Sequence, residues 1–253
     1  VLSASHLSPI VIGIIYSLFF RSLLVLSTWL NGHLLSSGQI TGMAEDPSLY
    51  TNIISGAVVF GYYTWMPRGI STVIRNLFKS GVVGSPKDKT SMSSSQFLEN
   101  MAACFNKWYW PVISLSTTII AFSVLILPRY LSLSESAAWA ADPFSLAVAS
   151  LWIFVGIYCI LSIALFSIMS ITWLKKLFSK FSITILPLHP DGSGGLSPLG
   201  NYALKLSYLI VLVGLILVIT PITRNFVING TFEFLWTSEL IVALGAYLVA
   251  APV

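Results

Sequence analysis

Charged residues are scarce in this 253-residue sequence. The chain has 13 Lys and Arg residues and 9 Asp and Glu residues, which together make up 9% of it, against roughly 25% in an average soluble domain. So few charges cannot cover the surface of a water-soluble protein, which excludes a soluble enzyme and a nucleic-acid-binding domain. Hydrophobic residues reach 56%, and the mean hydropathy is +0.86. This composition is typical of an all-α, polytopic membrane protein.

The residues and motifs of common catalytic and metal sites are also missing. Two cysteines, Cys104 and Cys159, are too few for a disulfide framework or a thiolate metal site. The sequence contains no H-E-x-x-H motif, no phosphate-binding G-x-x-x-x-G-K-S/T loop and no pair of intramembrane aspartates. His6, His33 and His189 are far apart in the chain. We therefore expect no enzymatic activity, no catalytic residues, no metal and no cofactor.

Long apolar runs, in contrast, are abundant. A helix needs about 20 apolar residues to cross the bilayer core. Six segments reach or approach that length, at 9–31, 48–66, 108–127, 144–174, 206–222 and 237–253. The sequence therefore predicts a single transmembrane domain of about six helices.

Proline and capping residues mark several ends of these helices. Ser8-Pro9, Asp142-Pro143 and Ser197-Pro198 each place a capping residue before a proline at the first helical position. Pro67 and Pro128 lie where the second and third helices should end.

Basic residues are concentrated in two of the connections. The stretch 67–107 contains six Lys or Arg residues and 175–205 contains four, whereas 128–143 and 223–236 contain one each and 32–47 contains none. Because basic loops stay on the cytoplasmic side, this segregation predicts that 67–107, 175–205 and both ends of the sequence are cytoplasmic. The bilayer, including its anionic lipids, is then a partner of the protein, and we expect no nucleic-acid partner.

Tryptophans support the same placement, because indole rings favour the two membrane interfaces. Seven of the eight lie at or near predicted ends of spans, at Trp29, Trp65, Trp108, Trp110, Trp139, Trp173 and Trp236. Trp152 alone lies well inside a span.

Two helices are predicted to extend beyond the membrane on the cytoplasmic side. The pattern of helix 144–174 continues to about Lys180. Apolar residues from Phe97 to Trp108 recur at helical spacing before the third span, and Pro111 would kink that helix at the lipid surface. Residues 84–95 are polar and rich in serine, which predicts a flexible loop.

A basic amphipathic helix is predicted directly after the second span. Ile70, Val73, Ile74, Leu77 and Phe78 follow helical spacing, while Arg75 and Lys79 lie elsewhere on the wheel and Arg68 precedes them. Such a helix either lies in the lipid headgroup layer or packs on the protein's own cytoplasmic helices. The sequence leaves both interpretations open.

One short motif precedes the fifth span. It consists of His189, Pro190, Asp191, Gly192, Ser193, Gly194, Gly195 and Leu196. His189 and Asp191 either bind a partner, ligand or ion, or stabilise a tight turn locally, and the second interpretation is preferred.

The run LPLHPDGSGGLSPLG at 186–200, placed between two spans, resembles a pattern in prokaryotic multi-pass membrane proteins that carry a His-Pro-Asp-x-x-Gly-Gly-Leu signature. The resemblance covers about fifteen residues and the order of the flanking helices. It implies a location in the prokaryotic inner membrane and no particular activity.

Arg21 is the one cation predicted near the middle of a span. A charge at that depth is costly unless it is paired or hydrated, so Arg21 lines a water-filled path or joins an inter-helix ion pair, for which Glu239 is the nearest candidate. Alternatively, it extends to the interface, or it marks the end of a displaced helix. Hydroxyl-rich spans and Ala57-x-x-x-Gly61 favour close helix packing over a polar pore lining.

Three functions fit these observations. The leading hypothesis is a homo-oligomeric pore or channel-like subunit, suggested by Arg21 and the hydroxyl-rich spans. The alternative is a non-conducting scaffold or sensor, of a stress or phage-defence type, that docks a cytoplasmic protein on 67–107 and the glycine-rich turn. A secondary transporter fits less well, because no internal repeat is visible.

Overall fold

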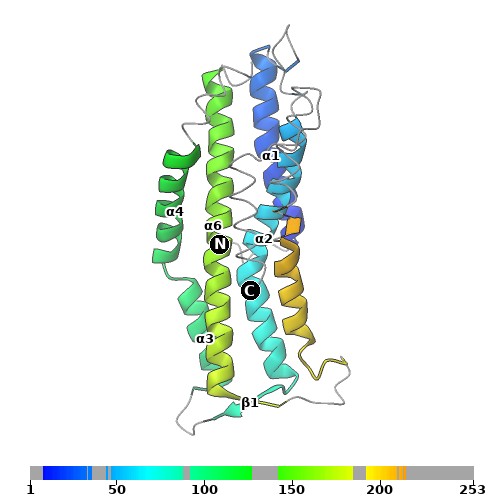
Figure 1. Ribbon diagram of the computed structural model, residues 1–253, viewed down its shortest axis with the longest axis vertical. Coiled ribbons are helices and arrows are strands. Elements are labelled where there is room, and N and C mark those ends of the chain that lie inside the picture. Colours follow the sequence, from blue (N-terminus) through cyan, green and yellow to red (C-terminus); the bar gives the residue numbers. More distant parts are fainter. Residues whose placement is uncertain are drawn as a thin grey trace.

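The computed structural model describes residues 8–32, 34–35, 44, 47–87, 92–126, 142–184, 192–209, 211–212 and 214. These residues form an elongated bundle whose helices run along one long axis (Figure 1). The prediction of an all-α fold is confirmed for this part of the chain, except for one short two-stranded ribbon.

Five α-helices and one π-helical turn follow each other in the described chain up to residue 180. They are α1 (Pro9–Leu30), α2 (Pro47–Lys79), α3 (Ser94–Phe105), α4 (Tyr109–Ala121), the π-helical turn η3 (Phe122–Ile126) and α6 (Pro143–Lys180). A further helix covers 197–209.

Two helix starts confirm the capping prediction. The Val11 amide donates to Ser8 Oγ at 3.3 Å, and the Ser145 amide donates to the Asp142 carboxylate at 2.7 Å. Helix α6 ends at Lys180, as its sequence pattern predicts.

Two expectations about prolines are wrong. Pro67 does not end the second helix, because α2 continues through it to Lys79. Burial of the apolar face beyond Pro67 offsets the loss of one backbone hydrogen bond. Nor does Pro111 kink a continuous third helix. The helix is interrupted at residues 106–108, and Pro111 lies in the first turn of the next helix, α4. In that turn a backbone N–H has no helical acceptor, so proline is tolerated.

The predicted flexible loop at 84–95 is also partly wrong. Residues Val83–Pro86 form strand β1, which pairs antiparallel with β2 (Phe181–Ile183). Lys87 secures the end of α6, because its backbone amide donates to Lys180 O at 3.0 Å and its Nζ donates to Phe178 O at 3.1 Å. The ribbon therefore joins the two basic stretches, 67–107 and 175–205, at one end of the bundle (Figure 1).

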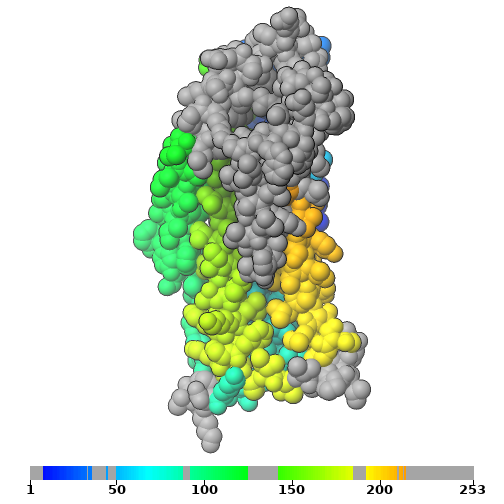
Figure 2. All heavy atoms as spheres, viewed as in Figure 1, coloured from blue at the N-terminus to red at the C-terminus, as the bar shows by residue number. Residues whose placement is uncertain are grey.

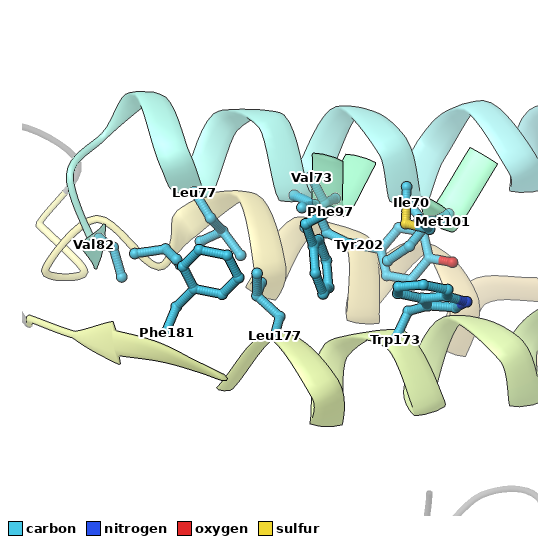
Figure 3. Close-up of a cluster of buried hydrophobic side chains, with 12 residues drawn as sticks. Ile70, Val73, Leu77, Val82, Phe97, Met101, Trp173, Leu177, Phe181 and Tyr202 are labelled. Atoms are coloured by element: carbon cyan, nitrogen blue, oxygen red, sulfur yellow. The ribbon is translucent and has the colours of Figure 1, made fainter. Parts of the chain in front are cut away.

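That end has a core of the kind found in water-soluble proteins. We call it the basic module: α2 from Arg68 onward, β1, α3, the end of α6 from Met169, and β2. Ile70, Ile74 and Leu77 are fully buried there, whereas Arg75 and Lys79 are exposed. Phe97 lies at the centre of this core (Figure 3), and its ring packs edge-on against Trp173 at 5.1 Å and Phe181 at 5.6 Å.

The opposite part of the bundle has the reverse pattern. Small or polar residues of α1 are buried, namely Gly13, Ser17, Arg21, Ser27 and Thr28, while its large apolar residues from Ile10 to Leu30 are mostly exposed. In α4, Ser114 and Thr118 are buried, and Ile113, Leu115, Ile119 and Ile120 are exposed. Helix α4 lies on the flank of α6 at the molecular surface (Figure 2). Such helices suit surroundings of lipid rather than water.

Two helices in the described part of the chain, α1 and α6, are long and apolar enough to cross a bilayer. This is fewer than the six expected. The predicted span 48–66 falls within α2, and α4 with η3 covers residues 109–126 of the predicted span 108–127. Neither meets that criterion. The span 237–253, and 206–222 apart from a few helical residues, lie outside the described residues.

Candidate functional site

Arg21 lies inside the bundle, halfway along α1. Only 5% of its surface is exposed, and its guanidinium carbon is 4.7 Å from the centre of the Trp152 ring on α6. A cation over an indole face is attracted by the ring quadrupole, most strongly where water is excluded. This burial does not fit an Arg21 that extends to the interface or marks a helix end. Glu239, its predicted partner, lies outside the described residues.

Trp152 is held in place by aromatic rings from two helices. Phe20 of α1 and Phe60 of α2 each lie 5.5 Å from it, measured between ring centres. Gly56 leaves room for the indole, because a Cβ at that position would collide with Trp152. The position of the Trp152 ring over Arg21 thus depends on Gly56 of α2.

Small residues also bring α1 and α2 together. The prediction of close packing at Ala57-x-x-x-Gly61 is confirmed, because a Cβ on Gly13 would collide with Ala57 O and lie 2.7 Å from Gly61 N. The Ser17 hydroxyl donates to Ile53 O at 2.6 Å across the same contact. Small residues permit such close approach of membrane helices, and polar groups add modest interhelical bonds.

The hydroxyl groups of α4 and α6 make bonds within the bundle. Ser114 and Ser162 join the two helices at 2.6 Å. Most of the others donate to the carbonyl four residues earlier in their own helix, as Thr117, Thr118, Ser167, Ser170 and Thr172 do. These bonds favour the packing interpretation over a polar pore lining for the described parts of both helices.

The predicted membrane-surface helix is not free to lie in a headgroup layer. Ile70, Val73, Ile74 and Leu77 face the core of the basic module together with Trp173 and Leu177 (Figure 3). Of the two interpretations left open by the sequence, the structure shows the second, in which the helix packs on the protein's own elements. The physical reason is that α3, α6 and the ribbon cover the apolar face that would otherwise enter lipid.

The cations on and beside this module are exposed, except for the half-buried Arg68, and make its surface strongly basic. The described residues of 67–107 and 175–205 include nine cations, namely Arg68, Arg75, Lys79, Lys87, Lys107, Lys175, Lys176, Lys180 and Lys205. Among the same described residues, Glu99 is the one acidic residue. Such an excess attracts anionic partners and strengthens as ionic strength falls.

The glycine-rich turn is attached to the same module. Gly192, Gly194 and Gly195 have φ values of 65°, 65° and 88°, a conformation that favours glycine. Leu196 packs against the module's core, and the Tyr202 hydroxyl donates to Ser170 Oγ at 3.2 Å. Burial raises the pKa of Tyr202 above its ordinary value. His189, Pro190 and Asp191 lie outside the described residues, so their role stays a prediction.

The sequence does not predict two kinds of contact in the site, the pairing of Arg21 with Trp152 and the lysine–aromatic pairs. Trp152 was visible as the one tryptophan deep within a span, and Arg21 as the one deep cation, but their pairing was not inferred. The sequence also does not predict three lysine–aromatic pairs. Lys107 lies 5.5 Å from the ring centre of Tyr109, Lys205 lies 5.5 Å from that of Trp65, and Lys176 lies 4.7 Å from that of Trp173. The first two pairs consist of residues typical of a membrane interface, and the third lies on the basic module.

No protein-family profile matches this chain, and no curated protein and no solved structure is significantly similar to it. Among the described residues, no group of three or more His, Cys, Asp or Glu side chains could hold a metal ion.

Proposed function

We propose that this chain is a multi-pass protein of a prokaryotic inner membrane, with six transmembrane helices and its basic end in the cytoplasm. The observation that carries the membrane placement is the reversed burial of α1 and α4, whose polar faces lie inside and whose apolar faces lie outside. The gathering of both basic stretches at one end supports the orientation, because cationic loops remain cytoplasmic.

The function proposed for it is that of a non-conducting scaffold or sensor that docks an acidic cytoplasmic protein on the basic module. Helix α6 supports this function because it is one uninterrupted helix of 38 residues, about 57 Å long at 1.5 Å per residue. The bilayer core accounts for ~30 Å of that length. The remainder extends into the basic module, so a displacement of α6 in the membrane would move a surface to which a partner binds.

Charge reversal on the exposed side of α2 tests this docking. A photo-crosslinking residue at Asn76, which is exposed on that side, should give one discrete protein adduct in native membranes. We expect Arg75→Glu with Lys79→Glu to abolish the adduct and Arg75→Lys with Lys79→Arg to retain it, because the second pair keeps both charges.

A second crosslinker at Leu115, on the exposed apolar side of α4, serves as the control and should give no such adduct. Equal adducts for the charge-reversed and charge-conserving proteins would contradict docking on this surface.

A homo-oligomeric pore is the second candidate, motivated by the presence of the cation Arg21 halfway along the apolar helix α1. In reconstituted liposomes, ion flux that changes with Arg21→Ala but not with Ser22→Ala, its exposed neighbour, would favour the pore. Sealed liposomes at high protein density favour the scaffold.

A further inference from the structure

A cavity lies at the interruption between helices α3 and α4. Its volume is about 220 Å³, larger than the roughly 150 Å³ cavity that binds benzene in an engineered protein core. Helices α2, α4 and α6 supply its walls, which include Tyr63, Trp110, Tyr158 and Phe166. The Trp110 indole donates to Cys104 O at 2.9 Å, which fixes the two helices around the break.

The cavity has a charged mouth, a wall that is mostly aromatic or aliphatic, and two serines at its inner side. Lys107 and Pro111 line it and are exposed, so the cavity reaches the surface there. Leu165 and the aromatic rings supply its apolar wall. Ser114 and Ser162 are buried and bonded to each other, so they close it on the inner side. A ligand with one anionic group and one apolar chain matches this order of side chains.

The position of the cavity matches a bilayer surface. Tyr62 donates to Lys205 O at 2.8 Å, and the next residue, Tyr63, lines the cavity with Lys107. Lys107 and Lys205 are therefore both close to the Tyr62–Tyr63 segment of α2, and each lies beside an aromatic ring at 5.5 Å. Lysine and aromatic residues at one depth are typical of the layer where phosphate headgroups lie.

We propose that this cavity binds one acyl chain of an anionic phospholipid, with Lys107 contacting the phosphate of its headgroup. The occupant is a lipid rather than a free anion because most of the lining is aromatic or aliphatic. This inference rests on the proposed membrane placement and is independent of the proposed docking function.

Lipid affinities of the purified full chain test the proposal. Native mass spectrometry would compare phosphatidylglycerol with phosphatidylcholine of identical chains. The wild type should bind phosphatidylglycerol more tightly than phosphatidylcholine. Lys107→Gln should lower the affinity for phosphatidylglycerol about fivefold, because one cation near an anionic headgroup contributes about that factor to binding. Lys205→Gln is the matched control, because Lys205 has the same ring distance but does not line the cavity. It should change the affinity less than twofold.

Leu165→Trp fills the cavity and should lower the affinity for both lipids, whereas Lys107→Gln should affect mainly phosphatidylglycerol. The two variants thus separate binding of the acyl chain from binding of the headgroup. Equal losses for Lys107→Gln and Lys205→Gln would overturn the proposal, because they would show only a general attraction to the basic surface. Displacement of phosphatidylglycerol by inorganic phosphate alone would also overturn it and indicate a free-anion site. If the membrane placement itself is wrong, exposed apolar positions on α6 will react with water-soluble reagents, whatever the lipid affinities are.

Discussion

Gly13→Ala should destabilise the protein by about 2–3 kcal/mol, the cost of overpacking a tight contact. The added methyl group would collide with Ala57 O and lie 2.7 Å from Gly61 N. Both are backbone atoms, so no side-chain rotation relieves the clash, and α1 and α2 must move apart. The free energy of unfolding, measured in mixed micelles by titration with a denaturing detergent, would show the loss.

Gly156→Ala is the matched control for Gly13→Ala. Gly156 also lies within a long apolar helix, but a Cβ there meets nothing within 4 Å. Alanine favours helix over glycine by up to ~1 kcal/mol, so this variant should be as stable as the wild type or slightly more stable. Equal destabilisation by both substitutions would show that α1 and α2 do not touch through Gly13.

Phe97→Ala should cost about 3–5 kcal/mol, the usual range for removing a buried phenyl ring from a core. The side chain is 1% exposed, and its ring contacts Trp173 and Phe181 as well as Phe78 at 6.5 Å. Removing it leaves a cavity between α2, α3 and α6. Hydrogen exchange at the amides of α3 and the ribbon should accelerate, while exchange at the amides of α1 should not change.

Phe19→Ala tests whether that effect is specific to the core of the basic module. Phe19 is 58% exposed on the apolar side of α1, the side that the proposed membrane placement turns towards lipid. Its loss should change the free energy of unfolding by less than about 1 kcal/mol. A larger loss for Phe19→Ala than for Phe97→Ala would contradict the assignment of the two regions to lipid and water.

Local features of the fold were predictable because their causes are local. A capping side chain and a proline specify a helix start within a few residues, as at Ser8-Pro9 and Asp142-Pro143. The small residues Ala57 and Gly61 indicate a close helix contact for the same reason. The end of α6 follows from the residues around Lys180 themselves.

Features that depend on distant residues were not predictable. The ribbon pairs Val83 with Ile183, and the polar composition around Val83 gives no sign of its partner. Pro67 has the usual effect of proline on local bonding, but tertiary burial of the helix beyond it decides the outcome. The cavity arises only when α2, α4 and α6 are assembled.

The candidate site shows the same division. The sequence identifies Arg21 as costly at its depth, because the long apolar run on either side of this cation is visible in the sequence itself. It does not identify Trp152 as the ring that covers it, since the two residues are on helices far apart in the chain. The sequence alone allows two interpretations of the amphipathic helix, because the same apolar face can contact lipid or protein.

If the proposed placement is right, one part of α6 lies in lipid and the other in water. Single cysteines along α6, in a chain whose native Cys104 and Cys159 are replaced, test it with a membrane-impermeant maleimide. Leu151 and Ile160 are 52% and 44% exposed in the structure, and Lys175 and Ser179 are also exposed. In inside-out vesicles, cysteines at 175 and 179 should react with the maleimide. Cysteines at 151 and 160 should not react, because lipid covers these two positions although the protein does not. Equal reaction at all four positions would show that α6 lies entirely in water and would contradict the claim.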